Sequence, residues 1–224
     1  MNDHKKQRYI PALSYDFLTP LYDPVVAVTT REKAFKSELV RQADPQPSQR
    51  ILDLGCGTAT LSIALKRTCP EASVQGLDGD PKILELARRK AAKAGAEIYL
   101  DQGLSFEMPY TDANFDTVVS SLFFHHLSIE DKLRTLAQVH RVLKPSGYLH
   151  IADWGRPSGF LMHIASLPVQ WLDGETATDS YKGVLPQLIS DSGFVEVSET
   201  GKFDSAFGTI RLHKAKKGGE IGTN

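Results

Sequence analysis

The feature that most constrains the fold of this chain is a regular alternation of short apolar segments with amphipathic ones. Strands are predicted where apolar residues cluster over five to seven positions, at 50–54, 72–78, 97–101, 115–121 and 148–153. The segments between them repeat apolar residues at helical spacing. This alternation is typical of a parallel sheet whose strands are joined by helices. We therefore expect an α/β fold with a doubly wound, mostly parallel sheet.

Capping residues mark where several helices begin and end. Thr29 with Glu32 three residues later forms a capping box, which predicts a helix that begins at Thr29. Asp80 precedes a proline at the first helical position, and Gly95 follows the last turn of the same helix. Ser128 opens a further helix. Beyond the fifth strand the pattern is less regular, and we expect a helix at 184–192 and two hairpin strands, at 194–200 and 207–216.

Composition narrows the class of protein. The chain has 224 residues and a formal net charge of −1, so no global electrostatic attraction favours nucleic acid. The two isolated cysteines and the absence of a signal-like N-terminus predict a cytoplasmic protein. The longest apolar stretch, at 160–172, is too short to span a membrane, although it leaves room for transient membrane contact. We expect a helical cap segment at 1–48, one α/β domain at 49–216 and a flexible tail at 217–224.

The loop after the first predicted strand, within "LDLGCGTATLSIAL", constrains the ligand. A dinucleotide site has G-x-G-x-x-G at this place, but here Thr60 stands where the third glycine would be. Asp53, just before the loop, would repel a pyrophosphate and favour a cation. Asp78 ends the next strand, where a carboxylate can accept hydrogen bonds from both hydroxyls of a ribose. A free ribose, an ammonium group and no phosphate are combined in S-adenosylmethionine (SAM). The alternative is that Asp53 only accepts hydrogen bonds from its own loop.

Four segments carry a family resemblance. "ILDLGCGTATLSIAL" and "VQGLDGDPKILELARRK" resemble the first motif and the ribose-binding segment of the class I SAM-dependent methyltransferases. "MPYTDANFDTVVSSLFFHHL" and "VHRVLKPSGYLHIADWGRP" resemble the subgroup that includes the ubiquinone and menaquinone C-methyltransferases. The resemblance covers about residues 15–157. It implies a Rossmann-like seven-stranded sheet in the order 3-2-1-4-5-7-6, with the last strand antiparallel.

The resemblance also implies which residues bind the cofactor. They stand at the ends of the first four strands: Asp53, Gly55, Cys56 and Gly57 for the methionine part, Leu77, Asp78 and Gly79 for the ribose and its surroundings, Gly103, Leu104 and Ser105 for the adenine, and Ser120 and Ser121 beside the sulfonium. Many members have an aspartate where this chain has Leu104, so Asp101, Gln102 or backbone groups are the alternatives for the adenine amine. Tyr15 and Tyr22 belong to an N-terminal helix that would close over the cofactor, with ordinary packing as the alternative.

Five side chains near the ends of the fourth and fifth strands are candidates for chemistry on an acceptor. Either His125 or His126 could act as a general base, and His126 is preferred as the residue facing the pocket. Asp153 could orient or deprotonate an acceptor, with a local capping role as the alternative. Trp154 could stack on an acceptor, and Arg156 could pair with an acidic group. No three ligands stand at a spacing that predicts a metal site.

The function predicted from these patterns is methyl transfer from SAM to a small-molecule acceptor. The apolar segment 159–172 follows the fifth strand and favours a hydrophobic, quinone- or lipid-like or aromatic acceptor if it forms a substrate lid. The alternative for that segment is a packing helix. Two other functions remain open: a catalytically silent SAM-binding sensor or partner subunit, and an NAD-dependent oxidoreductase, against which Asp53 and Thr60 argue. The oligomeric state is not predicted.

Overall fold

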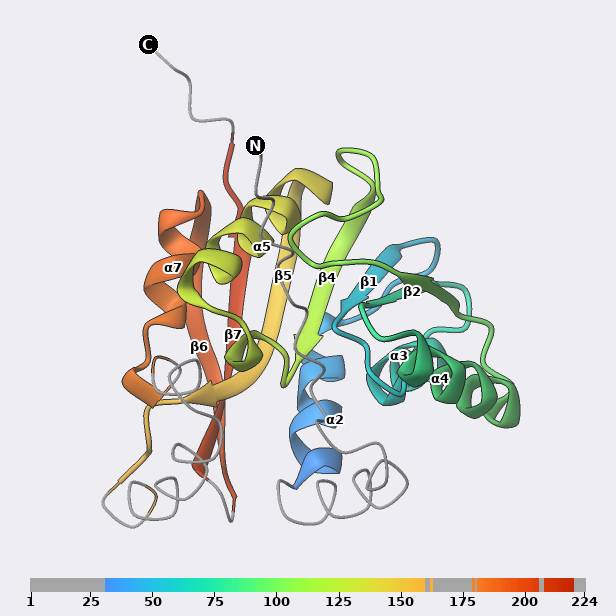
Figure 1. The fold of residues 1–224 in the computed structure, drawn as a ribbon, viewed down its shortest axis with the longest axis horizontal. Helices are drawn as coiled ribbons and strands as arrows, with labels where there is room; N and C mark the ends of the chain where they lie inside the picture. Colours follow the sequence, from blue (N-terminus) through green and yellow to red (C-terminus); the bar gives the residue numbers. More distant parts are fainter. Residues whose placement is uncertain (1–30, 160–161, 163–178, 180, 206–207, 220–224) are drawn as a thin grey trace, which may run out of the picture.

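A single twisted sheet of seven strands organises the molecule (Figure 1). The computed structural model describes residues 31–159, 162, 179, 181–205 and 208–219. The strands lie in the order β3-β2-β1-β4-β5-β7-β6, with these bounds: β1 Arg50–Leu54, β2 Ser73–Asp78, β3 Tyr99–Gln102, β4 Phe115–Ser121, β5 Leu143–Gly155, β6 Phe194–Ser205 and β7 Gly208–Lys217. The first five strands pair in parallel, whereas β7 is antiparallel to both β5 and β6. The predicted order and the antiparallel last strand are confirmed.

Helices cover both faces of this sheet, as a doubly wound fold requires. On one face lie α2 (Glu32–Ala43), α3 (Thr60–Thr68) and α4 (Pro81–Ala94), and on the other lie α5 (Ile129–Val142) and α7 (Leu185–Asp191). A short 3₁₀ turn, η1 (Phe124–His126), follows β4. The chain crosses from β1 through α3 to β2 in one direction along the sheet, and from β4 through α5 to β5 in the other. Because β1 to β5 are parallel, the loops at their carboxyl ends lie at one edge of the sheet.

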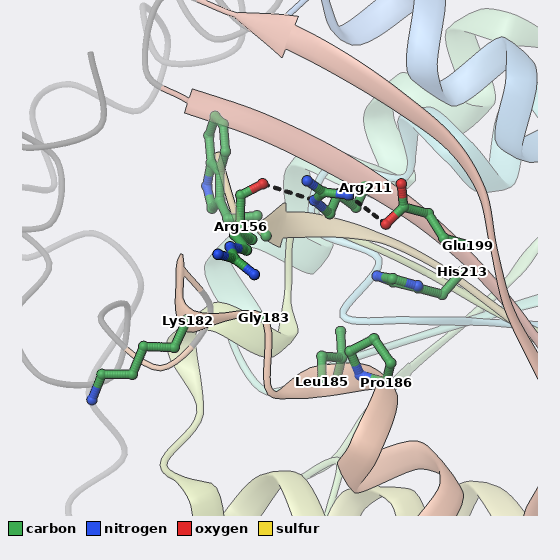
Figure 2. A pocket seen from close by; sticks show the side chains of 10 residues that line it. Arg156, Lys182, Gly183, Leu185, Pro186, Glu199, Arg211 and His213 are labelled. Carbon is green, nitrogen blue, oxygen red and sulfur yellow. Dashed lines mark hydrogen bonds and ion pairs between the residues drawn. The ribbon is translucent and has the colours of Figure 1, made fainter. Parts of the chain in front are cut away.

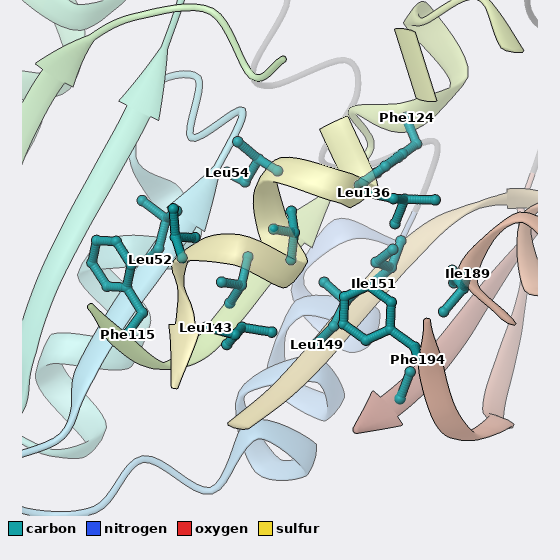
Figure 3. Packing of buried hydrophobic residues seen from close by; sticks show 14 of the residues in the cluster. Leu52, Leu54, Phe115, Phe124, Leu136, Leu143, Leu149, Ile151, Ile189 and Phe194 are labelled. Carbon is teal, nitrogen blue, oxygen red and sulfur yellow. The ribbon is translucent and has the colours of Figure 1, made fainter. Parts of the chain in front are cut away.

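The core on the α5 face shows why these segments become helices and strands (Figure 3). Leu136 and Val139 of α5 recur at helical spacing, and both are fully buried against the sheet. From β5, Leu149 and Ile151 point to the same face because alternate residues of a strand do so. On the opposite face, α2 buries Phe35 and Leu39 against the same strands.

Two predicted helix starts agree with the structure and one does not. Asp80 caps α4 by accepting hydrogen bonds from two backbone N–H groups, and Ser128 caps α5 by accepting one from the Asp131 N–H. The helix predicted from Thr29 begins instead at Glu32, with Arg31 as its N-cap in a left-handed conformation and without a side-chain cap. Glu32 forms an ion pair with Lys36, which lies one turn further along the helix. Thr29 itself lies outside the described residues.

The strand predicted at 148–153 is longer at both ends. β5 begins at Leu143, and the Lys-Pro-Ser-Gly segment forms an irregularity inside it, where the pairing with β4 shifts register between Phe115 and Thr117. Ser146 takes a positive φ of 63° there. The segment interrupts the strand without ending it, because the chain pairs with β4 again from Tyr148 onwards. Across the part of the chain that the structure describes, no helix is both long and apolar enough to cross a bilayer.

Candidate active site

The glycine loop between β1 and α3 lies at the edge where the strands end. Gly55 and Gly57 have φ values of +67° and +53°, which favour glycine over any other residue. A Cβ on Gly55 would lie 2.3 Å from the Phe123 ring, whereas a Cβ on Gly57 would meet nothing within 4 Å. The N–H groups of Gly55 and Cys56 donate to the Leu77 carbonyl, at 2.9 and 3.1 Å. The loop is therefore fixed on β2 and keeps open space beside Gly57.

Asp53 lies under this loop with its carboxylate almost completely buried. It is 1% exposed, and the Ser62 hydroxyl of α3 donates to its Oδ2 at 2.5 Å. Burial raises the pKa of Asp53 from 3.8 to about 6, although the hydrogen bonds from Ser62 and the charge of Lys36 oppose the rise. A cation placed beside this carboxylate would therefore be strongly favoured. The sequence did not point to Ser62 or Lys36, because both approach from helices.

Asp78 connects the end of β2 to the glycine loop. The Gly57 N–H donates to Oδ2 of Asp78 at 2.9 Å, and the Asp80 N–H donates to its Oδ1 at 3.0 Å. Burial raises the pKa of Asp78 above its ordinary value, and these backbone hydrogen bonds oppose the rise. Each carboxylate oxygen can accept more than one hydrogen bond, so the group retains capacity for ribose hydroxyls. Gly79 lies in the turn that follows, before α4 begins.

The loop after β3 supplies the next wall of this edge. Gly103 donates its N–H to the Asp78 carbonyl at 3.0 Å, and Leu104 forms an isolated bridge with Glu107. The Ser105 hydroxyl is buried and shares a hydrogen bond of 2.8 Å with Thr135 of α5, so its side chain faces the core rather than the edge.

Asp101, the alternative for the adenine amine, already accepts two hydrogen bonds on one oxygen. Gln75 donates to its Oδ2 at 2.5 Å and the Tyr110 hydroxyl at 3.0 Å. The second oxygen of Asp101 and the backbone of Gly103 are then the groups left for an adenine edge.

The N-terminus of α3 opens onto the same loop. Its N-cap, Ala59, supplies no side-chain acceptor for the first N–H groups. The Ser62 N–H already donates to Asp53, so the N–H groups of Thr60 and Leu61 are the ones available to an anionic group such as a carboxylate. Lys90 of α4 donates to the hydroxyls of Thr58 at 3.0 Å and Thr60 at 2.7 Å, which places a positive charge close by. Lys90 was not foreseen from the sequence. It reaches the loop from a helix thirty residues away.

Two serines at the end of β4 have different surroundings. The Ser120 hydroxyl donates to the Leu54 carbonyl at 2.9 Å and braces β4 against β1. The Ser121 hydroxyl is buried and has no hydrogen-bond partner among the described residues. A buried polar atom without a partner at this position fits a ligand that supplies one. Cys56 is also buried, and burial raises the pKa of its thiol well above the usual value, so it is not a poised nucleophile.

A buried histidine–aspartate pair joins β4 to β5. His125 Nδ1 lies 2.6 Å from Asp153 Oδ1, and both side chains are almost inaccessible. Asp153 also accepts from the backbone N–H groups of Phe123, His125 and Trp154, at 2.7 to 3.2 Å. Burial alone would raise the pKa of Asp153, but His125 and these hydrogen bonds hold it below its ordinary value. The carboxylate is therefore ionised and keeps a proton on His125 Nδ1.

His126, preferred from the sequence, has a different setting. Its side chain is exposed, and its ring centroid lies 3.9 Å from that of His125. Of the two adjacent histidines only His125 is paired with Asp153. This pairing could not be read from the sequence, because it depends on how η1 turns the chain after β4.

Other predicted residues lie outside the described part or have packing roles. Tyr15, Tyr22 and most of the segment 159–172 fall among the residues that the structure does not describe. Trp154 is buried and stacks on Tyr181, with ring centroids 6.3 Å apart. Among the described residues, no group of three His, Cys, Asp or Glu side chains is arranged to hold a metal ion.

The sheet order, the two carboxylates beneath a two-glycine loop and the open helix N-terminus together define the class of Rossmann-like proteins that bind SAM. A family model described as "Methyltransferase domain" matches residues 51–147. A demethylmenaquinone methyltransferase of Halalkalibacterium halodurans is 31% identical, over 79% of this chain and 80% of its own length. The chain belongs to the SAM-dependent methyltransferase family.

Further comparisons define how far the similarity extends. A demethylmenaquinone methyltransferase of Lactobacillus johnsonii is 38% identical, over 60% of this chain but only 53% of its own length. The chain thus matches about half of that relative. The crystal structure of a SAM-dependent methyltransferase from Aquifex aeolicus superposes with a TM-score of 0.65 over 89% of this chain and 96% of its own. At 18% sequence identity, this last likeness concerns the fold alone.

Proposed function

We propose that the protein transfers a methyl group from SAM to a small-molecule acceptor that is hydrophobic, whether quinone-like, lipid-like or an aromatic metabolite. The observation that carries the proposal is the pair of carboxylates at adjoining strand ends beneath the glycine loop, the buried Asp53 and the half-buried Asp78. The relatives named demethylmenaquinone methyltransferases support the acceptor class.

The residues of this edge suit the parts of SAM in turn. Asp78 would accept from the ribose hydroxyls, Asp53 would attract the ammonium group, and backbone N–H groups at the N-terminus of α3 would donate to the carboxylate. When bound, SAM supplies a methyl group on a sulfonium, which is already a strong electrophile. Most of the rate then comes from alignment of the acceptor with that methyl and from exclusion of water.

The His125–Asp153 pair gives the site a base if the acceptor must lose a proton. Asp153 holds a proton on His125 Nδ1, which leaves Nε2 as the nitrogen that can accept one. A hydroxyl or an acidic ring carbon would need this step, whereas an amine would not. The pair therefore favours acceptors of the phenol or hydroquinone type.

Methyl transfer is tested with SAM labelled on its methyl group, incubated with the purified protein and a deproteinised cell extract. Products are partitioned between organic solvent, water and precipitated macromolecules, and Asp78→Asn serves as the matched control. Label in the organic phase that is lost in the variant supports the proposal. Label that stays in water even after acidification to about pH 2 would contradict the hydrophobic acceptor. Absence of label from protein that binds SAM would favour a silent SAM-binding protein.

A further inference from the structure

A second hollow lies beside the candidate active site, on the α5 face of the sheet (Figure 2). It has a volume of about 340 Å³, and it is bounded by the end of β5, by β6 and β7, and by the segment that leads into α7. Arg156, Lys182, Glu199, Arg211 and His213 are its charged and titratable lining residues. The mechanism above uses none of them.

Two of the three cations in this hollow already have acidic partners. Arg211 Nη1 lies 2.5 Å from Glu199 Oε2, and its Nε donates to the Arg156 carbonyl at 2.8 Å. Lys182 forms an ion pair with Asp179 at 3.5 Å. The Arg156 guanidinium has no carboxylate partner among the described residues. The hollow therefore has one cationic charge more than these partners neutralise.

His213 adds a buried polar atom that lacks a partner. The residue is only 5% exposed, and its Nδ1 has no hydrogen-bond partner within the described ranges. Figure 2 shows its ring extending into the hollow between Arg211 and Pro186. Burial lowers the pKa of His213, so at neutral pH the ring is uncharged and carries one N–H donor. A bound acceptor atom opposite this ring would remove the cost of leaving a buried polar group without a partner.

The hollow lies within reach of the methyl-transfer edge. Trp154 and Gly155, at the end of β5, line it, and β5 pairs with β4, which in turn pairs with β1. Neighbouring strands are about 4.8 Å apart, so the β5 wall of the hollow lies about 10 Å across the sheet from the glycine loop, and His213 on β7 about 14 Å. That separation is about the length of a small aromatic molecule with one side group.

We propose that this hollow binds a carboxylate carried by the methyl acceptor, with Arg156 forming an ion pair with it and His213 donating a further hydrogen bond. The inference rests on the proposed function and narrows its substrate class to acids that also have an apolar or aromatic body. A planar guanidinium pairs with a carboxylate through two parallel hydrogen bonds. One unneutralised cation matches the single negative charge of a carboxylate. The carboxylate is an anchor and remains unmethylated in the product.

The first experiment measures binding without turnover. Benzoate and its uncharged analogue benzamide are titrated by calorimetry into protein saturated with S-adenosylhomocysteine. We expect benzoate to bind and benzamide to bind at least about tenfold more weakly. Arg156→Gln should weaken benzoate binding by about tenfold or more, because it removes the guanidinium that pairs with the carboxylate. Arg89→Gln, which removes an exposed arginine paired with Glu85 on α4, is the matched control and should change nothing.

Equal binding of benzoate and benzamide, or unchanged benzoate binding in Arg156→Gln, would overturn the inference. Because no methyl is transferred, this outcome is independent of whether the protein is a methyltransferase. A second readout uses labelled product from the extract experiment. A retained carboxylate makes the product enter organic solvent at about pH 2 but remain in water at about pH 9, since carboxyl groups titrate near pH 4. A product that enters organic solvent at both pH values would contradict the anchor.

Discussion

At the scale of single residues, Asp53 shows a conflict between stability and binding. Its carboxylate is buried and accepts a hydrogen bond from Ser62, and its pKa is raised to about 6. The folded protein therefore binds this proton more tightly than the unfolded chain does. The stabilising contribution is complete below about pH 4 and is lost as the pH rises through about 6, to a total of about 3 kcal/mol. A bound cation would offset this cost at neutral pH.

Asp53→Asn is expected to raise the free energy of unfolding of the ligand-free protein at pH 7, by about 1–3 kcal/mol, because it removes a buried charge. The same change should weaken SAM binding by about tenfold or more, because it removes the attraction for the ammonium group. Thermal unfolding and calorimetry measure the two effects. In the wild type, SAM affinity should fall as the pH falls through about 6. A destabilised variant with normal SAM affinity would refute this account of Asp53.

The His125–Asp153 pair gives a second prediction at the same scale. His125→Gln should reduce methyl transfer by about 10²-fold or more if the acceptor loses a proton, because the variant has no imidazole nitrogen at this position to accept it. SAM affinity should stay within about threefold of the wild type, and the fall in rate at low pH should disappear. His126→Gln is the matched control, since the neighbouring ring is exposed and is not paired with Asp153. A larger loss of methyl transfer in His126→Gln than in His125→Gln would indicate that His126 is the base.

At the scale of elements, the loop from β1 to α3 depends on two glycines for different reasons. Both have positive φ, but only at Gly55 would a Cβ collide with Phe123. Gly55→Ala should therefore lower the free energy of unfolding by about 1 kcal/mol for backbone strain plus about 1–3 kcal/mol for overpacking. Gly57→Ala should show the strain alone but weaken SAM binding, because its new methyl enters the open space beside the loop. Chemical denaturation and calorimetry separate these effects, and equal destabilisation by the two changes would contradict the packing argument.

The elements also show how far sequence reasoning reaches. Asp80, Ser128 and the glycine loop were read correctly because each depends on hydrogen bonds or dihedral angles within a few residues. The predicted start of α2 differs from the structure, in which the helix begins at Glu32 with Arg31 as its N-cap in a left-handed conformation. Rules that use only neighbouring residues can locate a helix, but they do not fix the residue at which it begins.

At the scale of the whole molecule, the residues that sequence reasoning missed are those brought together by topology. Ser62 reaches Asp53 from α3, and His125 meets Asp153 across two strands. His213 and Arg211 approach the end of β5 only because β7 inserts antiparallel between β5 and β6. The strand order was predicted through a family resemblance, whereas the contacts between these side chains are seen only in the structure.

The same scale explains why α2 belongs to the framework of the site. Gln42 Nε2 lies 2.8 Å from His150 Nδ1 of β5 and donates to the His213 carbonyl of β7 at 3.1 Å. Burial lowers the pKa of His150 to about 3, so the ring is neutral and can accept the amide proton. Phe35 of the same helix is fully buried against this face. The helix therefore ties β5 and β7 together beneath the edge that carries the site.

The measurement that tests the central claim most directly is calorimetric titration of the protein with SAM and with NADH, in the wild type and in Asp78→Asn. The two carboxylates predict that SAM binds, that NADH does not, and that Asp78→Asn weakens SAM binding by about tenfold or more. Binding of NADH in preference to SAM, or an unchanged affinity for SAM in Asp78→Asn, would contradict the assignment of this edge as the SAM site.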